Sequence, residues 1–170
     1  MGASGAGKTS LLNVLSDRIS KKKGASLTGR VTFNDEFEVK QNLFGNYCSY
    51  VMQDYVLFTY FTVKEALNFA ATLKLSHLTK EDIASRVEEL IQDLSLQHVQ
   101  DIRCGSALRK TISGGERKRT ALGVELITDP AVVLLDEPTS GLDSCRAESI
   151  VRLLKNLAHH KGKTIVSTIH

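Results

Sequence analysis

Short apolar runs alternate with longer amphipathic segments along this chain of 170 residues. The runs near the end of the chain, at 131–135 and 164–168, are rich in β-branched residues. Alternation of this kind is typical of an α/β fold built on a mostly parallel sheet. We therefore expect β-segments at 29–33, 37–39, 50–53, 131–135 and 164–168, with Asn34-Asp35 as the turn between the first two.

Helical periodicity fills the spaces between these strands, at 10–16, 113–126 and 144–157 and after Thr62 and Thr79. Thr62-x-x-Glu65 and Thr79-x-x-Asp82 each resemble a capping box, which satisfies free N–H groups at a helix start. Apolar residues at helical spacing predict core-facing sides in two of these helices. They are Leu11, Leu12 and Leu15 in the first helix, and Ile83, Val87, Leu90, Ile91 and Leu94 in the helix after Thr79.

Composition narrows the class of protein. Hydrophobic residues make up 42% and charged residues 24%, as in an ordinary globular domain. The net charge of +3 is too small to indicate a nucleic-acid partner, and the basic run at 21–23 is typical of a solvated turn. Cys48, Cys104 and Cys145 have neither disulfide nor zinc spacing, which favours free thiols in a reducing compartment. No apolar stretch approaches the ~20 residues of a membrane span, so we expect the chain by itself to be soluble.

A glycine-rich loop at the start of the chain is the first candidate for chemistry. Residues 2–9 match the pattern G-x-x-x-x-G-K-[ST] at every required position. Glycines let backbone N–H groups approach phosphate oxygens, and the next helix adds the positive end of its dipole. Lys8 is expected to reach the β- and γ-phosphates of a bound nucleotide, and the Thr9 hydroxyl to hold Mg²⁺. Taken alone, the loop indicates only a nucleotide-binding protein, because kinases, GTPases and motor ATPases share it. The candidate nucleotide-binding residues here are Gly2, Ser4, Gly5, Ala6, Gly7, Lys8, Thr9 and Ser10.

Two carboxylates follow the apolar strand at 131–135. Asp136 is placed to complete the Mg²⁺ site that Thr9 begins, and Glu137 to polarise the water that attacks the γ-phosphate. A solvated acidic pair at a strand end is the simpler interpretation of these two residues taken alone. The phosphate loop in the same chain favours the catalytic interpretation.

A second helix start carries an unusual pair of glycines. Ser113-Gly114-Gly115-Glu116 has the spacing of a capping box, which accounts for Ser113 and Glu116 by stability alone. Two glycines in a first turn cost about 1 kcal/mol each relative to alanine, so their presence favours a close approach to an anionic group. Because bare N–H groups at a helix start bind phosphate, the chain offers two such sites.

Taken in order, these motifs resemble the ATP-binding cassette (ABC) ATPases over essentially the whole chain. The resemblance rests on the loop at 2–9, Gln53, Ser113-Gly114-Gly115-Glu116, Asp136-Glu137, Ser140-Gly141-Leu142-Asp143 and His170. The sequences around Gln53, Thr62 and Ser113 are similar to the G subfamily, the eye-pigment and sterol or drug half-transporters. Glu116 stands where most ABC proteins carry glutamine, a departure that this subfamily shares.

The resemblance implies a P-loop NTPase fold with a RecA-like core at about 1–53 and 128–170 and a helical subdomain at about 54–127. It implies that Gln53, with Thr9 and Asp136, contacts Mg²⁺, and that His170 clamps the γ-phosphate. The helix start formed by Ser113, Gly114, Gly115 and Glu116 would face ATP held by a second cassette, with Asp143 at the junction between the two. The implied catalytic residues are Lys8, Gln53, Glu137 and His170, acting on ATP with Mg²⁺.

The implied function is the ATPase part of a membrane transporter at the cytoplasmic face of the membrane, coupled to export of a lipid-like or other small molecule. Its partners would be a second cassette and a transmembrane domain of the same polypeptide, docked at 54–62, where Tyr55, Tyr60 and Phe61 look exposed. Neither the transported molecule nor nucleic acid would bind this chain.

Two further expectations concern the extent of the chain and a competing function. Because no strand precedes the phosphate loop and His170 directly follows a strand, we expect a fragment truncated at both ends. The alternative function is a soluble ABC ATPase that acts on ribosomes or DNA. Only about 60 residues separate Gln53 from Ser113, which leaves no room for the coiled-coil arm of many such proteins.

Overall fold

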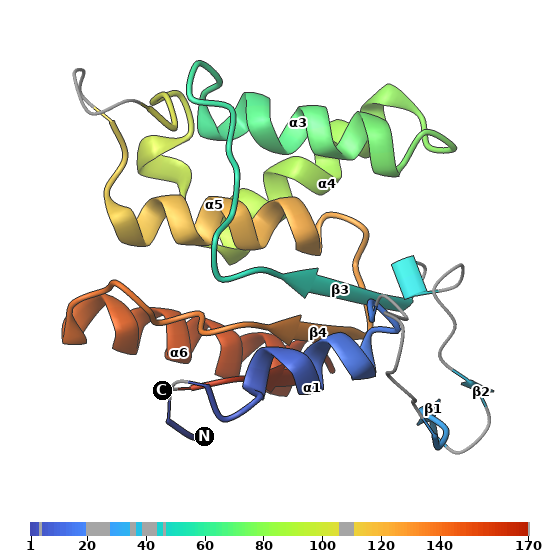
Figure 1. Ribbon diagram of the computed structural model, residues 1–170. Helices are drawn as coiled ribbons and strands as arrows, with labels where there is room; N and C mark the ends of the chain where they lie inside the picture. The colour runs from blue at the N-terminus through green and yellow to red at the C-terminus, as the bar shows by residue number, and fades with distance from the viewer. Residues whose placement is uncertain are drawn as a thin grey trace.

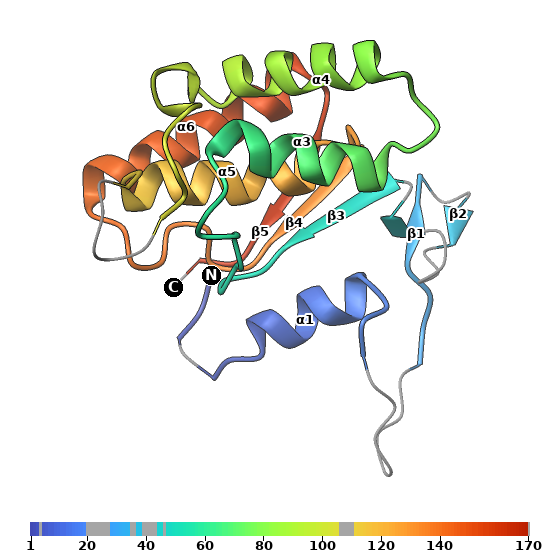
Figure 2. The ribbon, with the colours of Figure 1, turned by 90° about the horizontal axis from the view of Figure 1, so that it is seen from above.

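Three parallel strands that end in register organise the molecule. The computed structural model describes residues 1–3, 5–19, 28–34, 37–38, 44–45, 47–105 and 111–169. Strands β3 (Cys48–Val51), β4 (Val132–Leu135) and β5 (Thr164–Ser167) form one sheet in the order β3-β4-β5 (Figure 1, Figure 2). Val51 pairs with Leu135, and Leu135 pairs with Ser167. The residues that follow the three strands therefore meet at one edge of the sheet.

Helices cover both faces of this sheet. The helices of the described residues are α1 (Lys8–Leu15), α3 (Val63–Lys74), α4 (Lys80–Asp93), α5 (Gly114–Leu126) and α6 (Ser144–His160), with a 3-10 turn at Gln97–Val99. Leu12 of α1 is buried against Tyr50 and Leu134, whereas Val133 and Leu135 join the cluster that contains α5 and α6. Figure 2 shows α1 on one side of the sheet and α5 and α6 on the other. Side chains that alternate along β4 thus pack against helices on both faces of the sheet.

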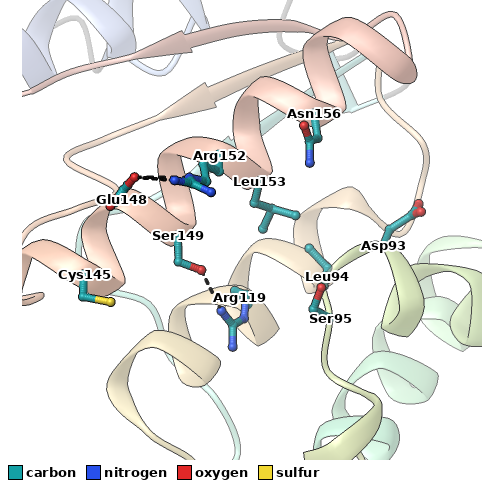
Figure 3. A pocket seen from close by; sticks show the side chains of 10 residues that line it. All are labelled: Asp93, Leu94, Ser95, Arg119, Cys145, Glu148, Ser149, Arg152, Leu153 and Asn156. Atoms are coloured by element: carbon teal, nitrogen blue, oxygen red, sulfur yellow. Dashed lines mark hydrogen bonds and ion pairs between the residues drawn. The ribbon is translucent and has the colours of Figure 1, made fainter.

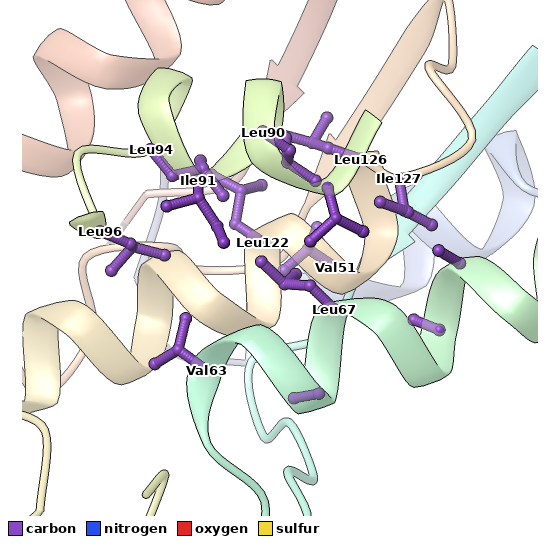
Figure 4. Packing of buried hydrophobic residues seen from close by; sticks show 14 of the residues in the cluster. Val51, Val63, Leu67, Leu90, Ile91, Leu94, Leu96, Leu122, Leu126 and Ile127 are labelled. Carbon is purple, nitrogen blue, oxygen red and sulfur yellow. The ribbon is translucent and has the colours of Figure 1, made fainter. Parts of the chain in front are cut away.

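The main apolar cluster lies where α3, α4 and α5 pack on one another and on the sheet (Figure 4). Leu67 of α3, Leu90 of α4 and Leu122 of α5 are each at most 2% exposed. Gly123 makes this close packing feasible, because a Cβ there would lie 2.7 Å from Leu94 and 2.8 Å from Leu67. Helices of this length are marginal in water, so the shared burial stabilises them.

The helix starts follow from local sequence. At α3, Thr62 accepts a hydrogen bond from the Glu65 N–H at 3.1 Å, and the Glu65 carboxylate accepts one from the Thr62 N–H at 2.8 Å, which completes the predicted capping box. At α4, Thr79 accepts from the Asp82 N–H at 3.1 Å, but the Asp82 carboxylate accepts from the Thr79 hydroxyl at 2.7 Å. The shorter Asp82 therefore forms only half of the predicted box.

Most of the predicted elements are confirmed, with shifted ends. The two β-segments near the start form an antiparallel pair, β1 (Thr32–Phe33) and β2 (Phe37–Glu38), whereas Asp35, Val39 and the basic run at 21–23 lie outside the described residues. The helix expected to end at 157 extends to His160. The buried position predicted for Leu11 is wrong, since this side chain is 59% exposed. Neighbouring helical residues point in different directions, and α1 buries the side centred on Leu12.

The hydrophobicity of the helices and the state of the thiols bear on the class of protein. None of the helices in the described part of the chain combines the length and the hydrophobicity that a bilayer crossing requires. All three cysteines are free thiols, of which Cys48 and Cys104 are buried and Cys145 is exposed. Burial raises the pKa of Cys48 to about 11 and also raises that of Cys104. Both buried thiols therefore stay protonated and unreactive at neutral pH.

Candidate nucleotide-binding site

The loop before α1 has the backbone that its glycines predict. Gly5 and Gly7 have φ angles of 78° and 81°, in the left-handed region that residues with a Cβ rarely adopt. Gly7 is the N-cap of α1, and no described side chain caps this helix start. The N–H groups of its first turn are therefore available to an anion, which the helix dipole also favours.

Lys8, the first residue of α1, reaches back over the loop. Its ammonium donates hydrogen bonds to the backbone oxygens of Gly2 at 2.8 Å and Ala3 at 3.0 Å. The same nitrogen lies 3.4 Å from Oε1 of Glu137, and both side chains are largely buried. The loop carbonyls and one carboxylate thus hold a positive charge beside the uncapped N–H groups at the start of α1.

A cavity of about 470 Å³ lies between this loop and the carboxyl ends of β3 and β4. Its volume is in the range of small-molecule sites. The lining residues come from three separate parts of the sequence and are Gly5, Gly7, Lys8, Thr9, Ser10, Gln53 and Glu137. Because the parallel strands end in register, residues 84 positions apart, Gln53 and Glu137, face one cavity.

Asp136 and Glu137 have different surroundings although they are neighbours. Asp136 is 4% exposed, and its Oδ1 accepts a hydrogen bond from the Thr168 hydroxyl at 2.6 Å. The hydroxyl oxygen of Thr168 in turn accepts a hydrogen bond from the Glu137 N–H at 2.9 Å. Glu137 has a φ of 45°, rare for a residue with a side chain, and its carboxylate lines the cavity. The turn after β4 thus separates a buried carboxylate from an accessible one.

Thr168 is a site residue that sequence reasoning missed. It follows β5, is 7% exposed, and donates its own N–H to the backbone oxygen of Leu135 at 3.0 Å. The sequence did contain a signal for this contact. The strand expected at 131–135 is followed by two carboxylates, and the strand expected at 164–168 ends in a hydroxyl residue. Only the pairing register shows that these ends are adjacent.

Gln53 joins the end of β3 to the acidic turn. Its Nε2 donates to Oε2 of Glu137 at 3.1 Å and lies 3.5 Å from the Ser140 hydroxyl. The carboxylate of Glu137 therefore lies between the amide of Gln53 and the ammonium of Lys8. Gln53, Glu137 and Lys8 thus bring an amide, a carboxylate and an ammonium close together at the cavity.

The start of α5 is the second predicted phosphate site, and it does not line the cavity. Ser113 accepts from the Glu116 N–H at 3.3 Å, and Glu116 accepts from the Ser113 N–H at 2.7 Å, so the predicted capping box is complete. Nε2 of His98 lies 2.9 Å from Oε1 of Glu116. Burial raises the pKa of Glu116, but the hydrogen bonds from Ser113 and His98 outweigh it and hold this pKa below its usual range.

Comparison with known proteins places the chain in a family. The family model described as ABC transporter matches residues 1–140. The chain belongs to the ABC transporter family. ABC transporter G family member 22 of Arabidopsis thaliana is 46% identical over 171 residues, which cover 100% of this chain and 22% of that protein. An ABC transporter ATP-binding protein/permease of Saccharomyces cerevisiae is 46% identical over 173 residues, which cover 100% of this chain and 13% of that protein.

A solved structure agrees with this assignment. CbiO1 from Clostridium perfringens, part of the ABC transporter complex CbiONQ, superimposes with a TM-score of 0.83 and 27% identity, over 100% of this chain and 65% of that chain. The expected P-loop fold of an ABC ATPase and the resemblance to the G subfamily are thereby confirmed. The chain spans only 13% and 22% of the length of the two relatives named above.

Of the remaining candidate residues of this ABC transporter family member, Ala6 and Asp143 do not line the cavity. Ser4 and His170 lie outside the described residues. Ala6 is exposed. Asp143 is the N-cap of α6, where it accepts from the Arg146 N–H at 3.0 Å and lies 3.2 Å from Nε of Arg146. That local contact accounts for Asp143 within one chain, and its place at a junction between cassettes stays a prediction.

A second pocket, of about 460 Å³, lies between the end of α4, α5 and α6, and shares no residue with the nucleotide cavity (Figure 3). Four of its polar side chains form two pairs with one another. Arg119 donates to the Ser149 hydroxyl at 3.2 Å, and Arg152 donates to the Glu148 carboxylate at 2.8 Å. We therefore assign the candidate chemistry to the cavity at the sheet edge.

Proposed function

We propose that this chain binds ATP with Mg²⁺ and hydrolyses it, as the ATPase cassette of a G-type ABC membrane transporter. The observation that carries the proposal is the cavity in which the phosphate loop, Gln53 and Glu137 meet. Free N–H groups and an ammonium to bind phosphates, with a carboxylate to act on water, are the groups that phosphoryl transfer to water requires.

The residues around the cavity fit a Mg²⁺ ion. The Thr9 hydroxyl lines the cavity, and Asp136 supplies a buried carboxylate with Oδ1 held by Thr168. The amide oxygen of Gln53 is a third candidate ligand. Mg²⁺ prefers hard oxygen ligands of this kind, supplemented by water and phosphate oxygens. When bound, the ion would neutralise charge on the β- and γ-phosphates.

The chain's own residues then divide the reaction between them. Lys8 would exchange its present partners, the loop carbonyls, for phosphate oxygens. Glu137 would accept the proton of the attacking water as general base. Gln53 would orient that base, since its amide already donates to the carboxylate. We propose that His170 assists Glu137 at the γ-phosphate.

Phosphate release from ATP by the intact polypeptide tests this function. The rate should fall to background when EDTA is in excess over Mg²⁺, because Thr9 and Asp136 then have no cation to bind. It should return when Mg²⁺ is restored. Absence of hydrolysis with Mg²⁺ would refute the ATPase proposal. A full rate in excess EDTA would refute the assigned metal site.

We further propose that two cassettes close head to tail, so that the α5 start of one faces the ATP of the other. Packing within this chain does not require the two glycines there. A Cβ at Gly114 would meet only Leu142, at 3.9 Å, and a Cβ at Gly115 would meet Arg146 at 3.5 Å, which are ordinary contacts. Each glycine costs the helix about 1 kcal/mol, and packing within the chain does not explain this cost. The glycines therefore support the close approach of an anionic group from another chain to the α5 start.

A linked dimer of two cassettes tests this arrangement with Lys8→Ala and Ser113→Arg. Placed in opposite cassettes, the two changes should damage the same ATP site and leave one site intact. Placed in the same cassette, they should damage both sites. Bound ATP per dimer, measured by equilibrium dialysis, should therefore be higher for the opposite arrangement. The reverse order would show that Ser113 serves its own loop.

The surface beside α3 supports a docking site for the transmembrane domain. Val56 and Tyr60 are 91% and 81% exposed, although Tyr55 and Phe61 are half-buried, unlike the exposed cluster expected. A groove of about 160 Å³ lies next to them, lined by Val56, Leu57, Phe58, Ala66, Phe69, Ala70, Leu73, Lys74 and Val124. Exposed apolar surface of this kind marks interaction sites. We propose that residues 54–127, which include α3–α5, form the helical subdomain that contacts the transmembrane domain. We also propose that the whole transporter exports a lipid-like or other small molecule.

A further inference from the structure

Lys118 is a buried charge that the proposed mechanism does not use. Of the residues that the structure describes, the buried charged ones are Lys118, 5% exposed, and Asp136, 4% exposed. Lys118 lies within the basic run of α5 between Arg117 and Arg119, which are half-buried. Burying an ammonium is unfavourable unless specific partners replace its hydration. The partners of Lys118 therefore indicate why the charge is there.

Those partners belong to one short segment after β3. Nζ of Lys118 donates to the backbone oxygen of Gln53 at 3.2 Å and lies 5.1 Å from the ring centroid of Tyr55. A carbonyl and an aromatic face are both favourable neighbours of a cation. The ammonium thus fixes the backbone of the residue whose side chain donates to Glu137.

The pKa of Lys118 lies below its usual value, because burial outweighs the carboxylates around the ammonium. Burial lowers the pKa of Lys118, and the negative charges of Asp54, Asp136 and Glu137 oppose this change. The carboxylates of the acidic turn after β4 thus favour the charged form of Lys118, whose hydrogen bond is to Gln53 after β3. An apolar side chain of similar length would fill the space without the desolvation penalty.

We propose that Lys118 is a positioning residue of the ATPase site, which holds Gln53 against Glu137 and ties this pair to α5. The inference rests on the proposed ATP hydrolysis. Lys118 and Ser113 lie on the same helix, about 7.5 Å apart along its axis. A displacement of the α5 start would therefore shift the Gln53 carbonyl and, through the Gln53 amide, its hydrogen bond to Glu137.

Three variants of the intact polypeptide test the role. Lys118→Met keeps the length and removes the charge and the donor, whereas Lys118→Arg keeps both. Lys163→Met is the matched control, because Lys163 also donates to a backbone oxygen, that of Asp129 at 3.1 Å, but lies at the other end of the sheet. We expect Lys118→Met to lower kcat about tenfold or more, with KM for ATP within about twofold, as expected for loss of a charged hydrogen bond that aligns the base.

Rescue by Lys118→Arg, together with a double variant, distinguishes a positioning role of Lys118 from a role in stability alone. Lys118→Arg should recover most of kcat, Lys163→Met should keep it, and the unfolding temperature of Lys118→Met should not fall. The effects of Lys118→Met and Gln53→Ala should be less than additive, because both act on the same group. An unchanged kcat in Lys118→Met, or full additivity with Gln53→Ala, would overturn the inference.

A readout without turnover distinguishes this inference from the ATPase proposal. The side-chain amide signal of Gln53 in ¹⁵N-glutamine-labelled protein can be assigned by its loss in Gln53→Ala. It should shift in Lys118→Met and return toward its original position in Lys118→Arg. If the wild type fails to hydrolyse ATP but the signal shifts, the proposed function fails and the positioning stands. If the wild type hydrolyses ATP and the signal is unmoved by Lys118→Met, the positioning fails.

Discussion

Replacing Glu137 by glutamine is expected to preserve ATP binding and to lower steady hydrolysis by about 10²- to 10⁴-fold, the usual contribution of a general base. Glutamine keeps the size of the side chain, and its amide oxygen can still accept from Nε2 of Gln53. Both residues carry a Cβ, so the φ of 45° at this position is equally strained in the two proteins. The carboxylate that would take the proton is what the variant lacks.

The measurements are initial rates of phosphate release and ATP affinity by titration calorimetry. Glu148→Gln is the matched control, since this carboxylate pairs with Arg152 on the surface of α6. It should leave both quantities unchanged. Undiminished hydrolysis by Glu137→Gln would remove Glu137 as the base, and weakened ATP binding would show that its charge serves the fold of the site instead.

The part of the fold that local sequence determines was predictable. The glycines of the phosphate loop and the capping boxes at Thr62 and Ser113 act within a few residues, and the structure shows each of them. The strands β4 and β5 were likewise recognisable, because β-branched runs between helices favour a buried parallel sheet. Because β4 also pairs in register with β3, Gln53 and Glu137 meet at one edge of the sheet.

Features set by packing between distant segments were not predictable. Thr168 contacts Asp136 only because β5 pairs with β4 in one register. Lys118 belongs to a run of three basic residues that is typical of a solvated helix surface, yet α5 faces β3 and buries the middle one. Leu11 was placed in the core because spacing alone does not tell how wide a side of α1 the sheet covers.

Replacing Lys8 by alanine is expected to weaken ATP binding about 10- to 100-fold, since hydrogen bonds to charged groups contribute about 1.5–3 kcal/mol. The structure adds a second cause. Lys8 lies 3.4 Å from Glu137, and without it this carboxylate would face the phosphates with no ammonium between them. Calorimetric titration with ATP measures the loss, and Lys64→Ala, which removes an exposed ion pair with Glu88, should leave the affinity unchanged.

Two further measurements tell a lost phosphate contact from a damaged loop. Lys8 also donates to the backbone oxygens of Gly2 and Ala3, so its removal frees part of the loop. If the contact is with the β- and γ-phosphates, the affinity for ATP should fall much more than that for AMP, which lacks both. A collapsed loop would instead lower the affinities for ATP and AMP to a similar extent and would also lower the unfolding temperature of the protein. Unchanged ATP affinity would mean that the N–H groups of the loop and the α1 dipole bind the phosphates without Lys8.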